Sequence, residues 1–275
     1  MSSPKVESTS LVEYIERWQE RARNIAPPEG TDIVISRGGL PGPAFFPEGS
    51  GLQNPTADAP WPDIMAIGHN FGCEDYRDEI ETSGREDDKA TWRNLRRLLT
   101  DASVPIESCF MTNWFVGLRS GNKQVGEFLS RPDARYEREC SELLIQQIGT
   151  LKPKVILLLG LPVVQRAHRI IPMLRQWANA TNWIAVDSSS LGPVAYEVAI
   201  LGTGARANVV ALLHPSFSPS NQRYRRTVFA VAKPEVEIVK CAVTRGLAQS
   251  LRRQNSARAE FPLQISGHQE LWVTN

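Results

Sequence analysis

The chain has 275 residues, 41% of them hydrophobic, and its 31 basic and 30 acidic side chains give a formal net charge of +1. This length suffices for one sizeable core, or for one core with appendages. No apolar run approaches the ~20 residues of a membrane span, and the polar residues 1–10 lack the apolar stretch of a signal peptide. We therefore expect a cytoplasmic protein without a membrane partner.

The charged residues are unevenly distributed along the chain. Two basic groups consist of Arg223, Arg225 and Arg226, and of Arg252, Arg253 and Arg258, and acidic residues gather between Glu74 and Asp88. A solvated face accounts for the second basic group and for the acidic one. For the first basic group a functional role is equally open, because it follows a candidate cleft segment and distribution matters more than total charge.

The four cysteines give no metal signature. Cys73, Cys109, Cys140 and Cys241 contain no Cys-x-x-Cys pair, so their spacing supports neither a zinc nor an iron–sulfur site. A disulfide framework is unexpected in a chain of this size without an export signal. We expect mostly buried thiols, no metal and no other cofactor.

The N-terminal quarter is predicted to be one helix followed by a long loop. Leu11, Tyr14, Ile15, Trp18 and Ala22 recur at helical spacing after Ser10, a plausible N-cap. Residues 27–63 are rich in Pro and Gly and show little periodicity apart from a short strand expected over residues 32–36. Such a long irregular segment is expected either to be functional or to wrap the core.

From residue 63 onward, short apolar runs alternate with helical patterns. The predicted strands are residues 64–68, 108–113, 155–160 and 209–214, with an extra hairpin from residues 181–187 and 193–201. The predicted helices are residues 88–99, 135–151, 162–177 and 224–253, the last interrupted at Pro234. This order predicts an α/β fold, a three-layer α/β/α sandwich with a central, mainly parallel four-stranded sheet. The domain division is residues 1–62 packed on the core, 63–255 as the α/β domain and 256–275 as a tail.

Chemically useful residues follow the predicted strands. In open parallel sheets a ligand binds at the carboxyl ends of the strands. Those ends carry Gly68-His69-Asn70-Phe71-Gly72, Thr112-Asn113-Trp114, Gly160-Leu161-Pro162 and His214-Pro215-Ser216-Phe217. We therefore expect these four segments to meet in one site.

Each of these residues also has a structural explanation. Gly68 and Gly72 permit a sharp turn as well as close approach of a ligand, and Asn70 could merely hydrogen-bond that turn. Asn113 could read a pyrimidine edge or satisfy backbone at a strand end. His214 could be a core histidine, although the following Pro-Ser fixes the backbone beside its imidazole.

Taken in order, the four segments resemble those of the uracil-DNA glycosylase superfamily. Members have a Gly-rich loop after the first strand, matched by Gly68–Gly72, and an asparagine after the second, matched by Asn113. A Lys-Pro-Lys, aliphatic strand and Gly segment is matched by Lys152–Gly160, and a strand ending in His-Pro-Ser by Leu212–Ser216. The resemblance covers roughly residues 63–226 and implies a uracil-DNA glycosylase-like fold.

The resemblance also implies a reaction, the hydrolysis of the N-glycosidic bond of uracil or another deaminated base in base excision repair. Such enzymes flip the base out of the DNA stack and need no metal. Asn70 matches the residue that places the attacking water, and as an amide it orients water rather than removing a proton. His214 matches the histidine that stabilises negative charge on the departing base. Asn113 matches the residue that reads the base edge.

The first loop departs from the family pattern. Phe71 stands where the family usually has Pro, and His69 where Glu, Gln or an apolar residue is more common; both would border the base together with Gly68. Gly72 stands where a Tyr would block a 5-methyl group, which implies a broader pocket. The aromatic ring that stacks on the base is left open between Phe71, Tyr76 and Trp92.

Contacts to DNA are expected after the histidine motif. Ser216, Phe217 and Arg223 match the region that contacts the minor groove and phosphates, with Phe217 as a wedge. Cys140 lies where the iron–sulfur branch of the family has a cluster ligand, but the N-terminal cysteine pair is missing, so we expect no cluster. The expected partner is DNA with a damaged or deaminated base, bound by a monomer.

Two alternatives remain. One is a catalytically silent module of the same fold that binds nucleic acid, nucleotide or a protein, motivated by the neutral charge and by His69 and Phe71. The other is an unrelated α/β enzyme with a coincidental His-Pro-Ser. A Ser216 nucleophile beside His214 looks sterically awkward at that spacing, and no Gly-x-Ser-x-Gly elbow is present.

Overall fold

The computed structural model of the chain describes residues 9–123, 128–129, 131–216 and 219–246. Its centre is a five-stranded sheet in the order β3-β2-β5-β7-β6. Four strands are parallel: β2 (Ile64–Gly68), β3 (Cys109–Asn113), β5 (Val155–Leu159) and β7 (Arg206–Leu212). The fifth, β6 (Val194–Ala199), pairs antiparallel with β7. The expected α/β class with a mainly parallel sheet is confirmed, and the expected number of four strands is wrong by this edge strand.

The strands are buried on both faces, which explains their continuous apolar sequence. Along β2, Met65 and Ile67 belong to one hydrophobic cluster, whereas Ile64 and Ala66 belong to another on the opposite face. The period of two residues along a strand separates the clusters in this way. The sheet is therefore the middle of three layers.

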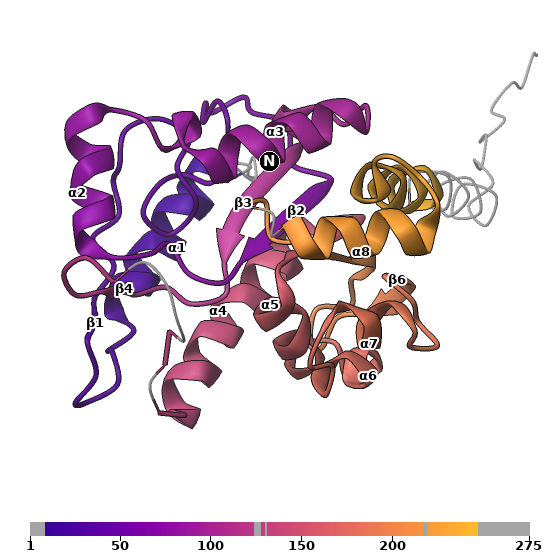
Figure 1. Cartoon of the computed structure of the whole chain (residues 1–275). Helices are drawn as coiled ribbons and strands as arrows, with labels where there is room; N and C mark the ends of the chain where they lie inside the picture. Colours follow the sequence, from indigo (N-terminus) through magenta and orange to yellow (C-terminus); the bar gives the residue numbers. More distant parts are fainter. Residues whose placement is uncertain (1–8, 124–127, 130, 217–218, 247–275) are drawn as a thin grey trace, which may run out of the picture.

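Helices cover both faces of the sheet (Figure 1). The first cluster includes apolar residues of α1 (Leu11–Asn24), α4 (Ala134–Leu151) and α5 (Leu161–Arg166). The second includes residues of α3 (Ala90–Asp101) and of a further helix at residues 234–246. Remaining helices are α2 (Glu74–Ser83), α6 (Arg175–Ala178), α7 (Trp183–Asp187), α8 (Pro219–Phe229) and 3-10 turns at Glu86–Asp88, Ile106–Ser108, Ala167–Arg169 and Pro172–Leu174.

Capping explains where the two long helices of the first face begin. The Ser10 side chain accepts from the backbone N–H of Glu13 at 3.3 Å, and Asp133 accepts from that of Tyr136 at 2.7 Å. These bonds satisfy N–H groups that the helix itself cannot pair. α4 ends where Lys152 takes a left-handed conformation, φ 47°. The predicted N-cap at Ser10 is confirmed.

The long loop at residues 27–63 lies along the outer edge of the sheet. The Phe46 N–H donates to the Met111 carbonyl at 3.0 Å, and the Met111 N–H donates to the Gly51 carbonyl at 2.7 Å. The loop also contains β1 (Ile33–Val34), which pairs antiparallel with β4 (Leu118–Arg119). The loop therefore wraps the core, one of the two expectations for it.

Three element predictions differ from the structure. Residues 181–187 form helix α7 rather than a strand, because the Asn182 side chain accepts from the Ala185 N–H at 3.0 Å and starts a helix. Residues 162–177 are broken into α5, two 3-10 turns and α6, since Pro172 begins a second turn. The helix predicted from residue 224 starts earlier, at residue 219 in α8, whereas the interruption expected at Pro234 is confirmed by the break between α8 and the helix that begins at residue 234. Its end and the 256–275 tail lie outside the described residues.

No helix in the described ranges is long and apolar enough to cross a membrane.

Candidate active site

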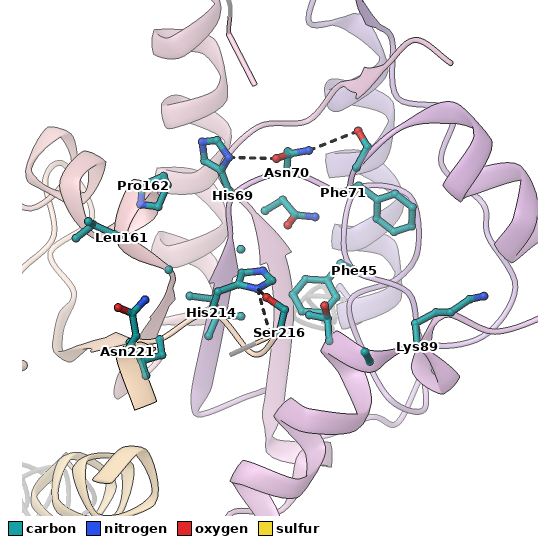
Figure 2. A pocket seen from close by; sticks show the side chains of 18 of the residues that line it. Phe45, His69, Asn70, Phe71, Lys89, Leu161, Pro162, His214, Ser216 and Asn221 are labelled. Atoms are coloured by element: carbon teal, nitrogen blue, oxygen red, sulfur yellow. Dashed lines mark hydrogen bonds between the residues drawn. The ribbon is translucent and has the colours of Figure 1, made fainter. Parts of the chain in front are cut away.

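A cavity of about 870 Å³ opens at the carboxyl ends of the strands. It lies where β2 pairs with β5, the point at which the chain order of the sheet reverses, and such switch points are where open α/β sheets bind ligands. Its volume is within the roughly 300–1,000 Å³ of small-molecule pockets. The cavity lining includes the predicted residues Gly68, His69, Asn70, Phe71, Gly72, Asn113, His214 and Ser216. Figure 2 shows His69 and Asn70 on one side of the cavity and His214 with Ser216 on the other.

Asn113 lines the cavity at the end of β3, where one neighbour binds its side chain and another leaves room for it. Its Nδ2 donates to the Phe46 carbonyl at 3.0 Å, and its Oδ1 lies 2.5 Å from where a Cβ on Gly68 would be. Only glycine at position 68 therefore leaves room for this amide. The structural alternative for Asn113 holds in part, since the side chain does satisfy backbone, but it also lines the cavity.

His214 is oriented by the turn that follows it. The Ser216 backbone N–H donates to His214 Nδ1 at 3.2 Å, and Ser216 Oγ lies 2.9 Å from the same nitrogen. A nitrogen that accepts carries no proton, so the neutral imidazole carries its hydrogen on Nε2. The surrounding protein lowers the pKa of His214 through desolvation. The ring is therefore held as a neutral donor.

The contact between Ser216 and His214 corrects the expectation that this spacing is sterically awkward. The two side chains do meet at 2.9 Å. The backbone N–H of Ser216 shares the acceptor nitrogen, so the basic atom of the imidazole is already engaged within the turn. Moreover, all four motifs border one cavity, whereas the unrelated-enzyme alternative would be favoured by motifs on different faces.

Two further residues fix the histidine turn from outside it. Asn94, on α3, donates from Nδ2 to the Pro215 carbonyl at 2.8 Å. Gly160, at the end of β5, has φ +95°, and a Cβ there would lie 3.4 Å from the Cβ of His214. The left-handed conformation and this close approach both favour glycine at position 160.

His69 and Asn70 form a pair within the first loop. His69 Nδ1 lies 3.1 Å from Asn70 Oδ1, and since that oxygen can only accept, the histidine donates. Desolvation, with Arg166 nearby, lowers the pKa of His69 to about 3, so the ring stays neutral. Its buried Nε2 has no hydrogen-bond partner among the described residues. The pair accordingly fixes the Asn70 amide and leaves the imidazole as an acceptor.

The space beside Gly72 is occupied by Tyr76. Gly72 has φ +130°, and a Cβ there would lie 3.4 Å from the Tyr76 ring. The rings of Phe71 and Tyr76 are 5.6 Å apart and both line the cavity. The tyrosine therefore borders the position where the sequence suggested open space.

The aromatic wall also includes a residue that sequence reasoning missed. Phe45, from the long loop, lines the cavity, and its ring packs edge-on against Trp92 with centroids 5.2 Å apart. Trp92 is fully buried behind Phe45 and is not part of the lining. Of the three aromatic candidates, Phe71 and Tyr76 thus remain, joined by Phe45.

Glu86 was also missed, because the acidic run to which it belongs looked like a solvated face. Glu86 and Asp87 are both buried, and Glu86 lines the cavity. Burial raises the pKa of Glu86 to about 7. No local spacing marks it, because its partners lie in other elements. By contrast, Phe45 could have been noticed in the sequence. Two adjacent phenylalanines, Phe45 and Phe46, within a Pro- and Gly-rich loop indicate that this part of the loop packs against the core.

The first basic group divides into one buried and two exposed residues. Arg225 is fully buried and forms ion pairs with Asp187 and Glu235 at 2.9 and 2.6 Å. Arg223 and Arg226 are exposed on α8, where they line a shallow groove. Phe217, the expected wedge, lies outside the described residues.

Metal-ligating side chains are not grouped in the described part of the chain: no three His, Cys, Asp or Glu residues are arranged to hold an ion. Cys73, Cys109 and Cys140 are buried and Cys241 is exposed, and all are free thiols. Burial raises the pKa of Cys109 and Cys140 to about 12, so these thiols are unreactive at neutral pH.

Searches of protein-family models and of curated proteins find no match to this sequence. The α/β architecture and the cavity geometry are therefore the basis on which a function is assigned.

Proposed function

We propose that this protein is a DNA glycosylase with a uracil-DNA glycosylase-like fold, which hydrolyses the N-glycosidic bond of uracil or another deaminated base flipped out of DNA. The observation that supports this proposal most strongly is that Asn70, Asn113 and His214, from three different strand ends, border one cavity. Each of the three has a side chain of the type that base recognition or water placement needs.

In this reaction His214 stabilises the departing base. The N-glycosidic bond breaks with its electron pair moving to the base, and negative charge develops on the base carbonyl oxygen. His214, with its hydrogen on Nε2 as the Ser216 contact requires, donates to that oxygen. A preorganised donor of this kind lowers the barrier because it needs no reorganisation when the charge forms. The lowered pKa favours the neutral ring throughout.

Water attacks the sugar carbon as the base leaves, and Asn70 orients that water. Asn70 Oδ1 accepts from His69 and retains a second lone pair for a water hydrogen. His69 thus acts through Asn70 by fixing its amide. The proton released by the water passes to solvent, and the base anion takes up a proton after release.

The test is incubation of the protein with labelled DNA that carries uracil, hypoxanthine or xanthine, in single- and double-stranded form, followed by alkali. We expect strand cleavage with at least one substrate. His214→Ala should reduce the rate by roughly 100- to 1,000-fold, as expected for loss of one charge-stabilising donor. His168→Ala is the matched control, because His168 bonds the Gln165 carbonyl and does not line the cavity. No cleavage on any substrate would overturn the proposal.

A second candidate is a catalytically silent module of the same fold that binds nucleic acid, nucleotide or a protein partner. The observation that favours it is the 3.1 Å contact between His69 and Asn70, which occupies part of the amide that would hold water. This candidate predicts binding without turnover, and binding that Asn70→Ala leaves unchanged. For DNA such binding should weaken steeply with salt, whereas salt-independent binding would indicate another ligand.

A further inference from the structure

We propose that Glu86 is a positioning residue of the cavity: its carboxylate fixes the long N-terminal loop to α3 and thereby sets the position of the Phe45 wall against which the ligand base lies. The part that concerns a base rests on the proposed function. The part that concerns the wall does not, and the two can be tested separately.

One oxygen of Glu86 joins two elements that are distant in the sequence. Its Oε2 accepts from the backbone N–H of Phe45 at 2.8 Å and from Nε1 of Trp92 at 2.8 Å. The first donor belongs to the long loop and the second to α3. Both bonds are buried, so removal of the carboxylate would leave both donors unsatisfied, and this cost favours local opening of the loop. Two donors at ideal distance use both lone pairs of that oxygen.

A third contact of the Glu86 carboxylate extends the same link to α2, which follows the first loop of the site. Tyr76 hydrogen-bonds Glu86, and its ring borders Gly72 and Phe71. Glu86 therefore contacts two residues of the aromatic wall, through the Phe45 backbone and the Tyr76 hydroxyl, and also the Trp92 ring that packs behind Phe45. Burial raises the pKa of the Glu86 carboxyl to about 7 and also raises the pKa of the Tyr76 hydroxyl.

The neighbouring Asp87 has a different task, although it is equally buried. It pairs with Arg85 and Arg96 at 2.6 and 2.8 Å and does not line the cavity. Two adjacent carboxylates of one 3-10 turn thus provide a matched comparison: Glu86 faces the cavity wall, and Asp87 faces surface arginines.

The test is hydrogen exchange of the Phe45 amide in the full chain, by NMR or at peptide resolution by mass spectrometry. In the wild type this amide should be protected. In Glu86→Ala it should exchange at least 10-fold faster, while amides of β2 and β5 keep their protection. Glu86→Gln retains an acceptor oxygen and should restore protection to within about 3-fold. Asp87→Asn should leave the Phe45 amide unchanged.

Equal protection of Phe45 in the wild type and Glu86→Ala would overturn the proposal, as would uniform loss of protection through the sheet in every variant at position 86. Should Glu86→Ala not fold, Glu86→Asp decides: it withdraws the carboxylate by one methylene and should release the Phe45 amide selectively.

Activity gives the second readout. With uracil-containing DNA, Glu86→Ala should lower kcat/KM on the order of 10-fold through loss of an ordered stacking surface, Glu86→Gln should recover most of it, and Asp87→Asn should match the wild type. If the wild type cleaves none of the DNA substrates, the proposed function fails, yet the exchange experiment still decides whether Glu86 positions the wall. If the wild type cleaves DNA and Glu86→Ala matches it, the role assigned to the wall in base binding is wrong.

Discussion

Asn113 Oδ1 and the α-carbon of Gly68 are so close that a Cβ on the glycine would lie 2.5 Å from the oxygen. The two residues are register partners across β2 and β3, and β3 is the edge strand of the sheet on that side. The absence of a side chain at the end of β2 thus leaves room for the Asn113 side chain at the end of β3.

Gly68→Ala should therefore lower the proposed activity by displacing the Asn113 side chain. A contact of 2.5 Å is shorter than real Cβ contacts, so the amide must leave its position and lose its bond to the Phe46 carbonyl. We expect at least a 10-fold loss of the proposed glycosylase activity and about 1–3 kcal/mol of destabilisation from overpacking. Activity on uracil-containing DNA and urea unfolding are the measurements.

Gly149→Ala is the control for this substitution. Gly149 lies within α4, and its added Cβ would meet the Thr203 methyl group at an ordinary 3.4 Å. Alanine in a helix interior should stabilise the protein by about 0.5–1 kcal/mol and leave activity intact. Full activity of Gly68→Ala would contradict the role assigned to Asn113.

The His69 imidazole should make stability depend on pH. Its folded-state pKa of about 3 lies below the ordinary 6.5, so the unfolded chain binds more protons between these values. The free energy of unfolding should be highest above pH 6.5 and fall on acidification, with a slope of at most about 1.4 kcal/mol per pH unit. Urea unfolding at pH 7, 6 and 5 should show a steeper decline for the wild type than for His69→Gln. Parallel curves would exclude the neutral buried histidine.

Glu86 acts in the opposite sense, since its pKa is raised to about 7 and its contribution falls as pH rises from 4.5 through 7. Because Glu86 is present in both the wild type and His69→Gln, its effect cancels in their difference.

Removal of the Arg225 guanidinium should destabilise the protein strongly. It pairs with Asp187 and Glu235, and it stacks on Trp183 with its central carbon 4.5 Å from the ring. Arg225→Met leaves two buried carboxylates without their cation, for which we expect a loss of about 3–5 kcal/mol. The measurement is the free energy of unfolding in urea.

Arg226→Met is the natural comparison, because Arg226 is exposed on the same helix. Its effect should stay within about 0.5 kcal/mol. If Arg225→Met changed the free energy of unfolding only slightly, the buried ion pairs would contribute no more stability than apolar packing at that position.

On the proposed function, Arg223 should contribute to DNA affinity without contributing to base recognition. It is exposed on α8 beside the cavity turn. For Arg223→Ala we expect weaker binding to all DNA sequences. We also expect the slope of log Kd against log salt concentration to be smaller by about 1. Fluorescence anisotropy between 50 and 200 mM salt measures the slope, with Arg138→Ala on α4 as the comparison. An unchanged slope would place the DNA elsewhere.

The parallel strands were predictable because they are buried on both faces. Their aliphatic runs, such as Val155–Leu159, have the length and the continuous apolar character of a strand that is buried on both faces. The edge strand β6 was predicted, but as one half of a hairpin with residues 181–187. That pairing was wrong because the Asn182 side chain starts helix α7 there. When a segment has both a strand-like apolar pattern and a helix-capping residue, its tertiary contacts decide which structure forms. The spacing of apolar residues carries no information about those contacts.

The candidate site was predictable where its residues follow strands. Asn70, Asn113 and His214 could be placed together because parallel strands end at one edge. Phe45 and Glu86 could not, because each reaches the cavity through partners from other elements. Glu86 in particular belongs to an acidic run, and its burial depends on donors from residue 45 and residue 92.

The loop at residues 27–63 both lines the cavity and covers the edge of the sheet. Phe45 of this loop lines the cavity, and the residues that follow it, Phe46 and Gly51, pair with the outer edge of β3 through both main-chain groups of Met111. An unpaired strand edge is a template for association with other chains. Substitutions that detach this loop from the sheet would thus expose the backbone groups at the edge of β3. Variants selected for a wider pocket should therefore aggregate more readily.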